Sequence, residues 1–229
     1  MNRNRLLLLG AAVAAAAIVV VVLIVAGAGK DSTKTVTGAD PDSAHAHPFK
    51  GVPQHGATLG RPGAPATLTV YEDPQCPFCR DWNLNALPAV VADYVRPGKV
   101  KLVYRGVNII GPNSEQGLRA VYAAGRQDKL WNVSEALYAQ QGEENSGWIT
   151  DAVIRQAATD AGANAEKVLA AASSPAVTAE LKASRDEAHA IGLPGTPTFV
   201  LQRPLSQPVQ LNAPLDAPGF ESALASALQ

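Results

Sequence analysis

The sequence predicts an α/β fold in which a block of helices separates two pairs of strands. Residues 67–71 alternate in polarity and are rich in β-branched side chains, which is typical of a strand. Similar patterns place further strands at residues 100–104, 198–201 and 208–211. Between the second and third of these strands, at about residues 112–192, apolar side chains recur at helical spacing. We therefore expect a sheet that carries an inserted helical domain.

The first strand leads directly into a helix. Asp73-Pro74-Gln75 ends the strand, and apolar residues then follow at helical spacing until Pro97-Gly98. They are Trp82, Leu84, Leu87, Val90, Val91 and Tyr94. Both cysteines of the chain, in Cys76-Pro77-Phe78-Cys79, therefore lie at a strand-to-helix junction. Pro77 falls in the first turn, where its missing N–H leaves no helical hydrogen bond unmade.

Helices are also expected throughout the insertion and after the last strand. Thr150 and Ser174 precede two of them as N-caps, and Gly162 and Gly192 end them. The residues expected to face the core are Leu118, Val121, Tyr122, Leu130, Trp131, Leu137, Tyr138, Val153, Ile154, Ala157, Val177, Leu181 and Ala188 in the insertion, and Phe220, Leu224 and Leu228 in the terminal helix. We interpret the aromatic residues among them as core rather than as a substrate groove.

An uncharged apolar segment precedes this domain. Residues 6–28 hold no polar side chain over 23 positions, or about 34 Å of helix, which is enough to cross a hydrocarbon core of about 30 Å. Because Arg3 and Arg5 precede it, we expect residues 1–5 to lie in the cytoplasm, residues 6–28 to anchor the chain in the membrane and the rest to be exported. The alternative is a signal peptide cleaved after Ala26-Gly27-Ala28, but the apolar run exceeds the usual signal core of about 7–15 residues.

The remainder has the composition of an ordinary exported domain. The whole chain has a net charge of -1, and the part after Lys30 holds 16 Lys and Arg against 20 Asp and Glu. This balance excludes binding of nucleic acid through a basic face, and a total of two cysteines excludes a disulfide-dense scaffold. Residues 29–48 are polar and rich in Gly and Pro, so we expect a flexible linker. It is expected to end in a short edge strand near residues 49–52, and residues 49–229 then form one domain.

The Cys76-Pro77-Phe78-Cys79 motif predicts thiol chemistry. A thiolate is the reactive form of cysteine, and the free backbone N–H groups and the dipole at a helix N-terminus stabilise it. Cys76, at the exposed end of the helix, is expected to be the nucleophile, and Cys79, one turn further on, a buried resolving thiol. No His or Lys lies between them, so the helix end must supply most of the stabilisation, against nearby negative charge on Glu72 and Asp73.

Two other interpretations of the cysteines are open. A structural disulfide between them would close a loop too short to constrain the unfolded chain much. A zinc site would need two more ligands from His45, His47, His55 and His189, and a copper carrier would use methionine, which the exported part lacks. Because His45 and His47 lie in the expected linker, we expect no metal and no other cofactor.

A second motif supports redox chemistry. Residues 192–201 end a helix and enter a strand, and Thr196-Pro197 stands immediately before the strand. A trans proline fits poorly before a core strand, which favours the cis isomer, and the alternative is an ordinary loop proline. A cis bond would expose the backbone of Thr196 to a bound peptide in extended form.

Together the two motifs resemble the thioredoxin superfamily, and the stretches around them resemble its DsbA-like branch. These stretches are Gly56-Ala57-Thr58-Leu59-Gly60, Ala64-Pro65-Ala66-Thr67, Glu72-Asp73-Pro74-Gln75-Cys76-Pro77-Phe78-Cys79 and Gly195-Thr196-Pro197-Thr198-Phe199. Pro197 follows Cys79 by 118 positions, which is room for the helical insertion of DsbA-like proteins. The resemblance covers about residues 50–229 and implies a thioredoxin fold with an inserted helical domain.

The resemblance also implies an activity. Combined with the anchor expected at residues 6–28, it implies a membrane-anchored, extracytoplasmic thiol–disulfide oxidoreductase that introduces disulfides into exported client proteins with free thiols. The implied site residues are Cys76 and Cys79 as the catalytic pair, Pro77 and Phe78 as the dipeptide of the active-site helix, and Thr196 and Pro197 as the substrate-binding loop. A membrane reoxidase of the DsbB or vitamin K epoxide reductase type would restore the disulfide, and we expect a monomer without nucleic-acid partners.

Departures from the family leave other functions open. Pro77-Phe78 lacks the histidine that stabilises the thiolate of the best-known family oxidant, so that protein's very acidic thiol is not expected here. A reductase on the same fold is the main alternative, followed by an isomerase, although isomerases of this type usually add a dimerisation domain. From a different class, the alternative is a metal carrier or chaperone that uses the fold only for binding.

Overall fold

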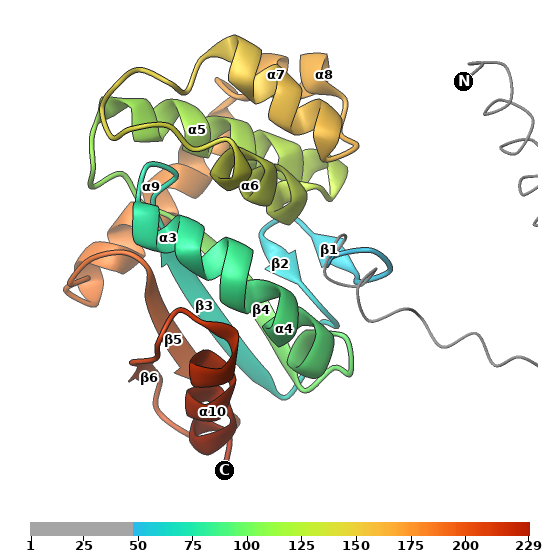
Figure 1. Ribbon diagram of the computed structural model, residues 1–229, viewed down its shortest axis with the longest axis vertical. Helices are drawn as coiled ribbons and strands as arrows, with labels where there is room; N and C mark the ends of the chain where they lie inside the picture. The colour runs from blue at the N-terminus through green and yellow to red at the C-terminus, as the bar shows by residue number, and fades with distance from the viewer. Residues whose placement is uncertain (1–47) are drawn as a thin grey trace, which may run out of the picture. The chain divides into compact units, whose positions relative to one another are not determined.

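The structure is a computed structural model that describes residues 48–229, and its centre is a six-stranded mixed sheet (Figure 1). The strands are β1 (Gln54–His55), β2 (Thr58–Leu59), β3 (Ala66–Glu72), β4 (Val100–Gly106), β5 (Thr198–Gln202) and β6 (Val209–Leu211). They are ordered β1-β2-β4-β3-β5-β6, and only β3 and β4 run parallel to each other. The expected α/β fold class is confirmed, and the strands expected at residues 67–71, 100–104, 198–201 and 208–211 are each present within two residues of their expected bounds.

The central strand β3 ends four residues before Cys76. Alternate residues Leu68, Val70 and Glu72 are buried, whereas Thr67 and Thr69, on the other face, are half-buried. Parallel pairing with β4 and antiparallel pairing with β5 continue almost to the end of β3. The active-site loop therefore begins at the interior of the sheet rather than at its edge.

The helix that follows β3 is continuous over residues 77–95 but contains two π-helical turns. Its parts are α3 (Pro77–Asp81), η2 (Trp82–Ala86), α4 (Leu87–Val90) and η3 (Val91–Val95). Pro88 has no N–H to donate to Leu84, and its ring would clash with that carbonyl in a regular α-helix. The wider turn resolves the conflict, because the N–H of Leu87 bonds to the carbonyl of Trp82, five residues back.

Five α-helices form the insertion, one more than the helices expected from sequence. They are α5 (Pro112–Ala124), α6 (Leu130–Ala139), α7 (Asp151–Asp160), α8 (Ala165–Ala171) and α9 (Pro175–Ala190), with a short 3₁₀ turn η4 (Gly125–Gln127) after α5. The hydroxyls of Thr150 and Ser174 accept from the third residue of α7 and α9, as expected of N-caps. Sequence periodicity did not reveal α8, because it is short and buries only Val168 fully.

The C-terminal helix α10 (Ala217–Ala227) packs against α4 and η2 (Figure 1). Phe220 and Leu224 are fully buried as expected, and Leu228 is half-buried at the helix end. The rings of Trp82 and Phe220 lie 4.4 Å apart between centroids. This contact holds α10 against the helix that begins at the cysteines.

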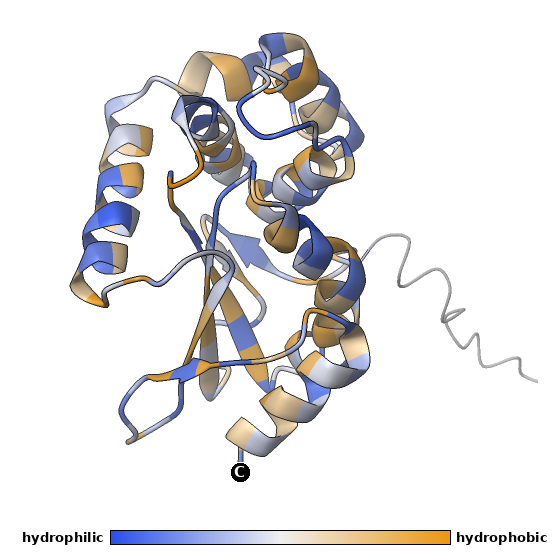
Figure 2. Cartoon of the chain, turned by 60° about the vertical axis from the view of Figure 1, so that its left-hand side comes forward, coloured by the Kyte–Doolittle hydropathy of each residue, from blue (hydrophilic) through white to orange (hydrophobic). Residues whose placement is uncertain are grey.

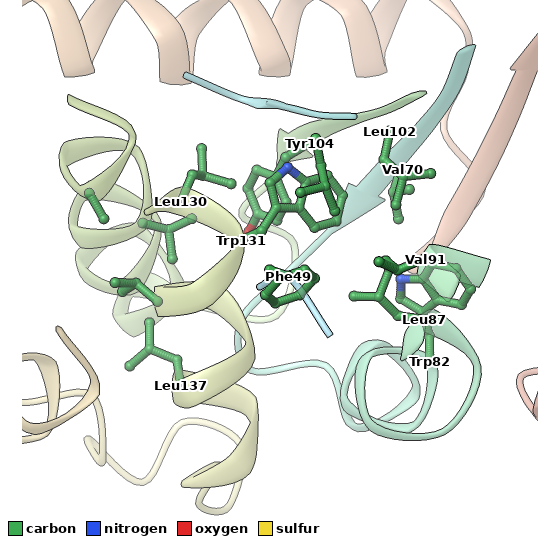
Figure 3. Close-up of a cluster of buried hydrophobic side chains, with 14 of the residues drawn as sticks. Phe49, Val70, Trp82, Leu87, Val91, Leu102, Tyr104, Leu130, Trp131 and Leu137 are labelled. Atoms are coloured by element: carbon green, nitrogen blue, oxygen red, sulfur yellow. The ribbon is translucent and has the colours of Figure 1, made fainter. Parts of the chain in front are cut away.

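A second aromatic cluster joins the insertion to the sheet, and Figure 3 shows its members pointing toward one another. Trp131 of α6 lies 5.8 Å from Tyr104 of β4 and 6.5 Å from Phe49, measured between ring centroids. All three are buried, so the aromatic residues of the insertion are core, as expected. The helices carry hydrophobic and hydrophilic faces along their length, which is visible in Figure 2.

The expected edge strand at residues 49–52 is wrong. These residues form a tight turn closed by a hydrogen bond from Val52 N to Phe49 O at 3.0 Å, with Gly51 at φ 74°. Phe49 and Val52 are buried in the core, and this accounts for their apolar character without a strand. The edge of the sheet is instead the β1–β2 hairpin, which has Gly56 at its turn.

No helix within residues 48–229 is long and apolar enough to cross a membrane. The predicted cytoplasmic tail at residues 1–5, the predicted anchor at residues 6–28 and nearly all of the predicted linker at residues 29–48 lie outside the described residues.

Candidate active site

Cys76 stands at the N-cap of α3, where the strand-to-helix junction was expected. Its backbone is extended (φ -73°, ψ 120°), and Pro77 begins the helix. The N–H of Cys76 bonds to the carbonyl of Asp73 at 2.9 Å, and its own carbonyl accepts from Arg80 N at 3.1 Å. Both cysteines are free thiols, and Cys79 faces the interior one turn into the helix.

The side chain of Cys76 is less exposed than its position at the helix end suggested. Cys76 is only 3% exposed, because Tyr138 of α6 and Ile110 of the loop after β4 pack against the two cysteines. By contrast, Phe78 between the cysteines is 61% exposed. Little of Cys76 is therefore accessible to solvent.

The two sequence motifs meet in the structure. The Thr196–Pro197 peptide bond is cis, as expected. The thiol of Cys76 donates to the carbonyl of Thr196 with an Sγ–O distance of 3.2 Å, across a sequence separation of 120 residues. Folding therefore places the Thr196-Pro197 loop directly over the first cysteine.

The two thiols differ in acidity. Hydrogen bonding from the Cys79 thiol is the main cause that lowers the pKa of Cys76 to about 6, with further contributions from Thr196 and from the backbone N–H groups of Cys79 and Phe78, against the opposing effect of burial. Burial raises the pKa of Cys79 well above its usual value. At neutral pH Cys76 is therefore the thiolate and Cys79 the protonated partner.

The sequence suggested that a negative charge on Glu72 would oppose the Cys76 thiolate, but the structure does not support this. Glu72 is completely buried, and burial raises its pKa to about 8. The carboxyl group is therefore mainly neutral at pH 7. Asn83 Nδ2 donates to Glu72 Oε1 at 2.6 Å and to the carbonyl of Cys79 at 2.9 Å, and this amide links the buried acid to the resolving cysteine.

Asp73 has a different role, because four donors surround its carboxylate. Its Oδ1 accepts from Gln75 N at 2.9 Å and from Ser114 Oγ at 2.6 Å. Its Oδ2 accepts from Ile109 N at 2.8 Å and from Ile110 N at 2.9 Å. This carboxylate ties the active-site loop to the loop after β4 and to α5, so it is a structural element of the site.

The insertion also holds the backbone around Cys76, which sequence reasoning missed. Gln141, just after α6, donates from Nε2 to the carbonyls of Pro74 at 2.9 Å and Cys76 at 3.1 Å. The hydroxyl of Tyr138 donates to the carbonyl of Asp73 at 3.1 Å. No sequence motif marks Gln141, because its function depends only on where α6 ends in space.

A cavity of about 270 Å³ adjoins the Thr196-Pro197 loop. Phe78 forms one wall, and Phe199, Leu211 and Leu215 line the apolar remainder. This places the exposed dipeptide residue Phe78 and the loop residues Thr196 and Pro197 around one hollow next to Cys76, as a polypeptide substrate would require.

Within residues 48–229, no group of three or more His, Cys, Asp or Glu side chains could hold a metal ion. His55 is exposed, 3.6 Å from Asp128, and His189 belongs to α9. His45 and His47 lie outside the described residues.

The chain is similar to known proteins in sequence and in fold. The family model described as thioredoxin matches residues 53–210. A probable disulfide bond formation protein D from Bacillus cereus is 32% identical over 99 residues, which cover 42% of this chain and 46% of that protein. The chain spans about half the length of the curated relatives it matches.

Solved structures extend the likeness to the whole described domain. BdbD from Bacillus subtilis, in its oxidised form, superposes with a TM-score of 0.66 at 19% identity, covering 77% of this chain and 97% of that one. A thioredoxin-like oxidoreductase from Silicibacter pomeroyi gives a TM-score of 0.60 at 27% identity, covering 82% and 98%. The fold is therefore that of the DsbA-like proteins, with the helical insertion between β4 and β5, and the chain belongs to the thioredoxin family.

Proposed function

We propose that this chain is an extracytoplasmic thiol–disulfide oxidoreductase that introduces disulfides into exported proteins. The observation that carries the proposal is the difference in acidity between the two thiols. Cys76, beside Thr196, has a pKa of about 6, whereas Cys79 is buried and has a raised pKa. A stabilised Cys76 thiolate favours the reduced form of the pair and so makes its disulfide a better oxidant. Similarity to disulfide bond formation protein D supports the same activity.

The oxidation proceeds by two exchange steps. A client thiolate attacks Cys76 Sγ of the Cys76–Cys79 disulfide, the S–S bond breaks, and Cys79 leaves as a thiolate that takes up a proton. A second client thiolate then attacks the client sulfur of the mixed disulfide, and Cys76 leaves as a stabilised thiolate. The client gains a disulfide and loses two electrons, and the enzyme pair gains them as a dithiol.

The remaining site residues bind and orient the client chain. The Thr196-Pro197 loop pairs with it in extended form, and Phe78 contributes an apolar contact from the helix side. A membrane reoxidase of the DsbB or vitamin K epoxide reductase type accepts the two electrons. The catalytic domain acts as a monomer that residues 6–28 anchor to the membrane, with the N-terminus in the cytoplasm.

The redox potential of the Cys76–Cys79 pair tests this function. An oxidant requires a potential near or above about -200 mV, whereas a value below about -250 mV would instead indicate a reductase. Stoichiometric oxidation of a reduced two-cysteine peptide by the preoxidised full-length chain is expected, and it should be absent in Cys76→Ser. Cys76→Ser protein that still oxidised the peptide would contradict the assignment of the nucleophile.

A further inference from the structure

A second hollow, distinct from the cavity at Phe78, is lined by residues of the loop after β4, of α9 and of the loop that leads into β5. Its volume is about 370 Å³. Val107, Ile109 and Leu193 give it an apolar wall, and Arg185 and His189 of α9 stand at one side. No acidic side chain of the described residues lines it. The hollow therefore combines an apolar surface with the positive charge of Arg185 at one side.

Two loops connect this hollow to Cys76. The loop after β4 carries Ile109, and the next residue, Ile110, packs against both cysteines. The other loop carries Leu193, three positions before Thr196, whose carbonyl accepts from the Cys76 thiol. Both walls of the hollow are thus continuous with groups that contact the reactive cysteine.

The two hollows lie toward different strands of the sheet. In the sheet order β4-β3-β5-β6, the cavity at Phe78 belongs to the β5–β6 side, since Phe199 and Leu211 line it. The second hollow belongs to the β4 side, because Val107 directly follows β4. Thr196 lines the first hollow and Leu193 lines the second, so the loop that leads into β5 borders both.

Several side chains at the second hollow are available for a partner. Ile109 is 51% exposed and Ile191, beside Gly192 of its lining, is 47% exposed, which is unusual for large aliphatic residues. Among residues 48–229, Arg185 forms one ion pair, which is long at 3.7 Å from its Nη1 to Glu115 Oε2. That carboxylate is already bound by Arg119 at 2.7 Å, so the charge of Arg185 is free to act on an incoming group.

We propose that this second hollow selects client segments that carry an aliphatic and an acidic residue close to the cysteine being oxidised. The proposal rests on the proposed function, because the occupant is the client chain itself. Ile109 and Leu193 contact the aliphatic side chain, and Arg185 pairs with the acid at the rim. Charge complementarity of this kind acts mainly on the rate of encounter and on partner choice.

The test compares peptides that differ at flanking positions only. Preoxidised full-length protein is mixed with reduced two-cysteine peptides that have Leu-Glu, Leu-Lys or Ala-Ala on either side of the first cysteine, and the rate of disulfide transfer is followed by acid quenching and chromatography. We expect the Leu-Glu peptide to react about 3- to 10-fold faster than the Leu-Lys peptide at low salt. Arg185→Glu should reverse this order, and Ile109→Ala should reduce the rates of both leucine peptides toward that of the Ala-Ala peptide.

Arg155→Glu is the matched control. Arg155 lies on α7, outside the lining of both hollows, and its side chain is 48% exposed against 46% for Arg185. Equal rates for the Glu and Lys peptides, or the same change in Arg155→Glu as in Arg185→Glu, would overturn the proposal. Dithiothreitol has no flanking residues, so its oxidation by the wild-type chain reports the Cys76–Cys79 pair alone. Failure of the wild-type chain to oxidise dithiothreitol would refute the proposed function instead.

Discussion

The Sγ atom of Cys76 lies 3.2 Å from the carbonyl oxygen of Thr196. This contact suits a thiol, which can donate, but a thiolate at the same place would face a second acceptor. The side-chain hydroxyl of Thr196 is buried and has no hydrogen-bond partner in the described part of the chain. When Cys76 ionises, that hydroxyl can donate a hydrogen bond to the thiolate. The backbone carbonyl of Thr196 therefore accepts from the thiol, and its side-chain hydroxyl donates to the thiolate.

Thr196→Val should therefore raise the pKa of Cys76. The substitution keeps the shape of the side chain and removes the hydroxyl. Because the thiolate then loses a hydrogen bond, the pKa of Cys76 should rise by about one pH unit. The thiolate absorbance near 240 nm, titrated with pH, measures the change. Thr159→Val, at an exposed site on α7, is the control and should leave the titration as it is. An unchanged pKa in Thr196→Val would show that the hydroxyl does not reach the thiolate.

Substitutions of Cys79 should separate its hydrogen bond from its role in exchange. Hydrogen bonding by Cys79 is the main cause of the low pKa of Cys76. Cys79→Ser keeps a donor and should leave iodoacetamide alkylation of Cys76 half-maximal near pH 6, whereas Cys79→Ala should move the midpoint upward. In Cys76→Ser, the remaining Cys79 should resist alkylation at neutral pH, since burial raises its pKa. Equal midpoints for the Ser and Ala variants would assign the low pKa to Thr196 and the backbone N–H groups of the helix end instead.

Glu72 should make the protein less stable as the pH rises. Burial raises its folded-state pKa to about 8 from an ordinary value of 4.5, so between these values the folded state binds the extra proton. The free energy of unfolding should then fall with rising pH across this window, by on the order of 3 kcal/mol between pH 4.5 and 7.

Glu72→Gln should abolish that contribution, because the amide does not ionise and its oxygen can still accept from Asn83. The difference in unfolding free energy between Glu72→Gln and wild type, measured in urea at several pH values with both proteins reduced, isolates Glu72 from the thiols. It should grow in favour of the variant as the pH rises toward 8. A difference that does not vary with pH would mean that folding does not raise the pKa of Glu72.

Asp73→Asn should destabilise the fold at neutral pH. The amide of asparagine has one oxygen that accepts and one NH2 group that cannot. One of the two pairs of donors around Asp73 therefore loses its acceptor. The expected loss is about 2–4 kcal/mol in unfolding free energy. Asp151→Asn, at an exposed carboxylate that accepts from Gln116, should cost much less in the same urea titration. Similar losses in the two variants would argue against a structural role for Asp73.

The sequence predicts most of the fold because its signals are local. Thr150, Ser174 and Gly192 act as helix ends through contacts within one turn, and each occurs where expected. The turn at residues 49–52 was misassigned because buried apolar residues occur in turns as well as in strands. Only the positive φ of Gly51 separates the two possibilities, and φ is not encoded by hydropathy.

The active site is less local, and sequence predicts it only in part. Cys76, Cys79, Thr196 and Pro197 could be named from their motifs, and the structure brings them together. The protonation of Glu72 could not be predicted, because it depends on complete burial beneath α3 rather than on its neighbours in sequence. The support from Gln141 was equally hidden, since it follows from the packing of α6 against the active-site helix.

The hydrogen bonds that hold the Cys76 loop have a consequence for the order in which the site can form. A chain synthesised as far as α4 already contains Cys76 and Cys79, but not Ser114, Gln141 or Thr196, on which the geometry of Cys76 depends. The segment that carries both cysteines is therefore complete long before its partners are. The arrangement around Cys76 can form only after residues as far as Thr196 have been added to the chain.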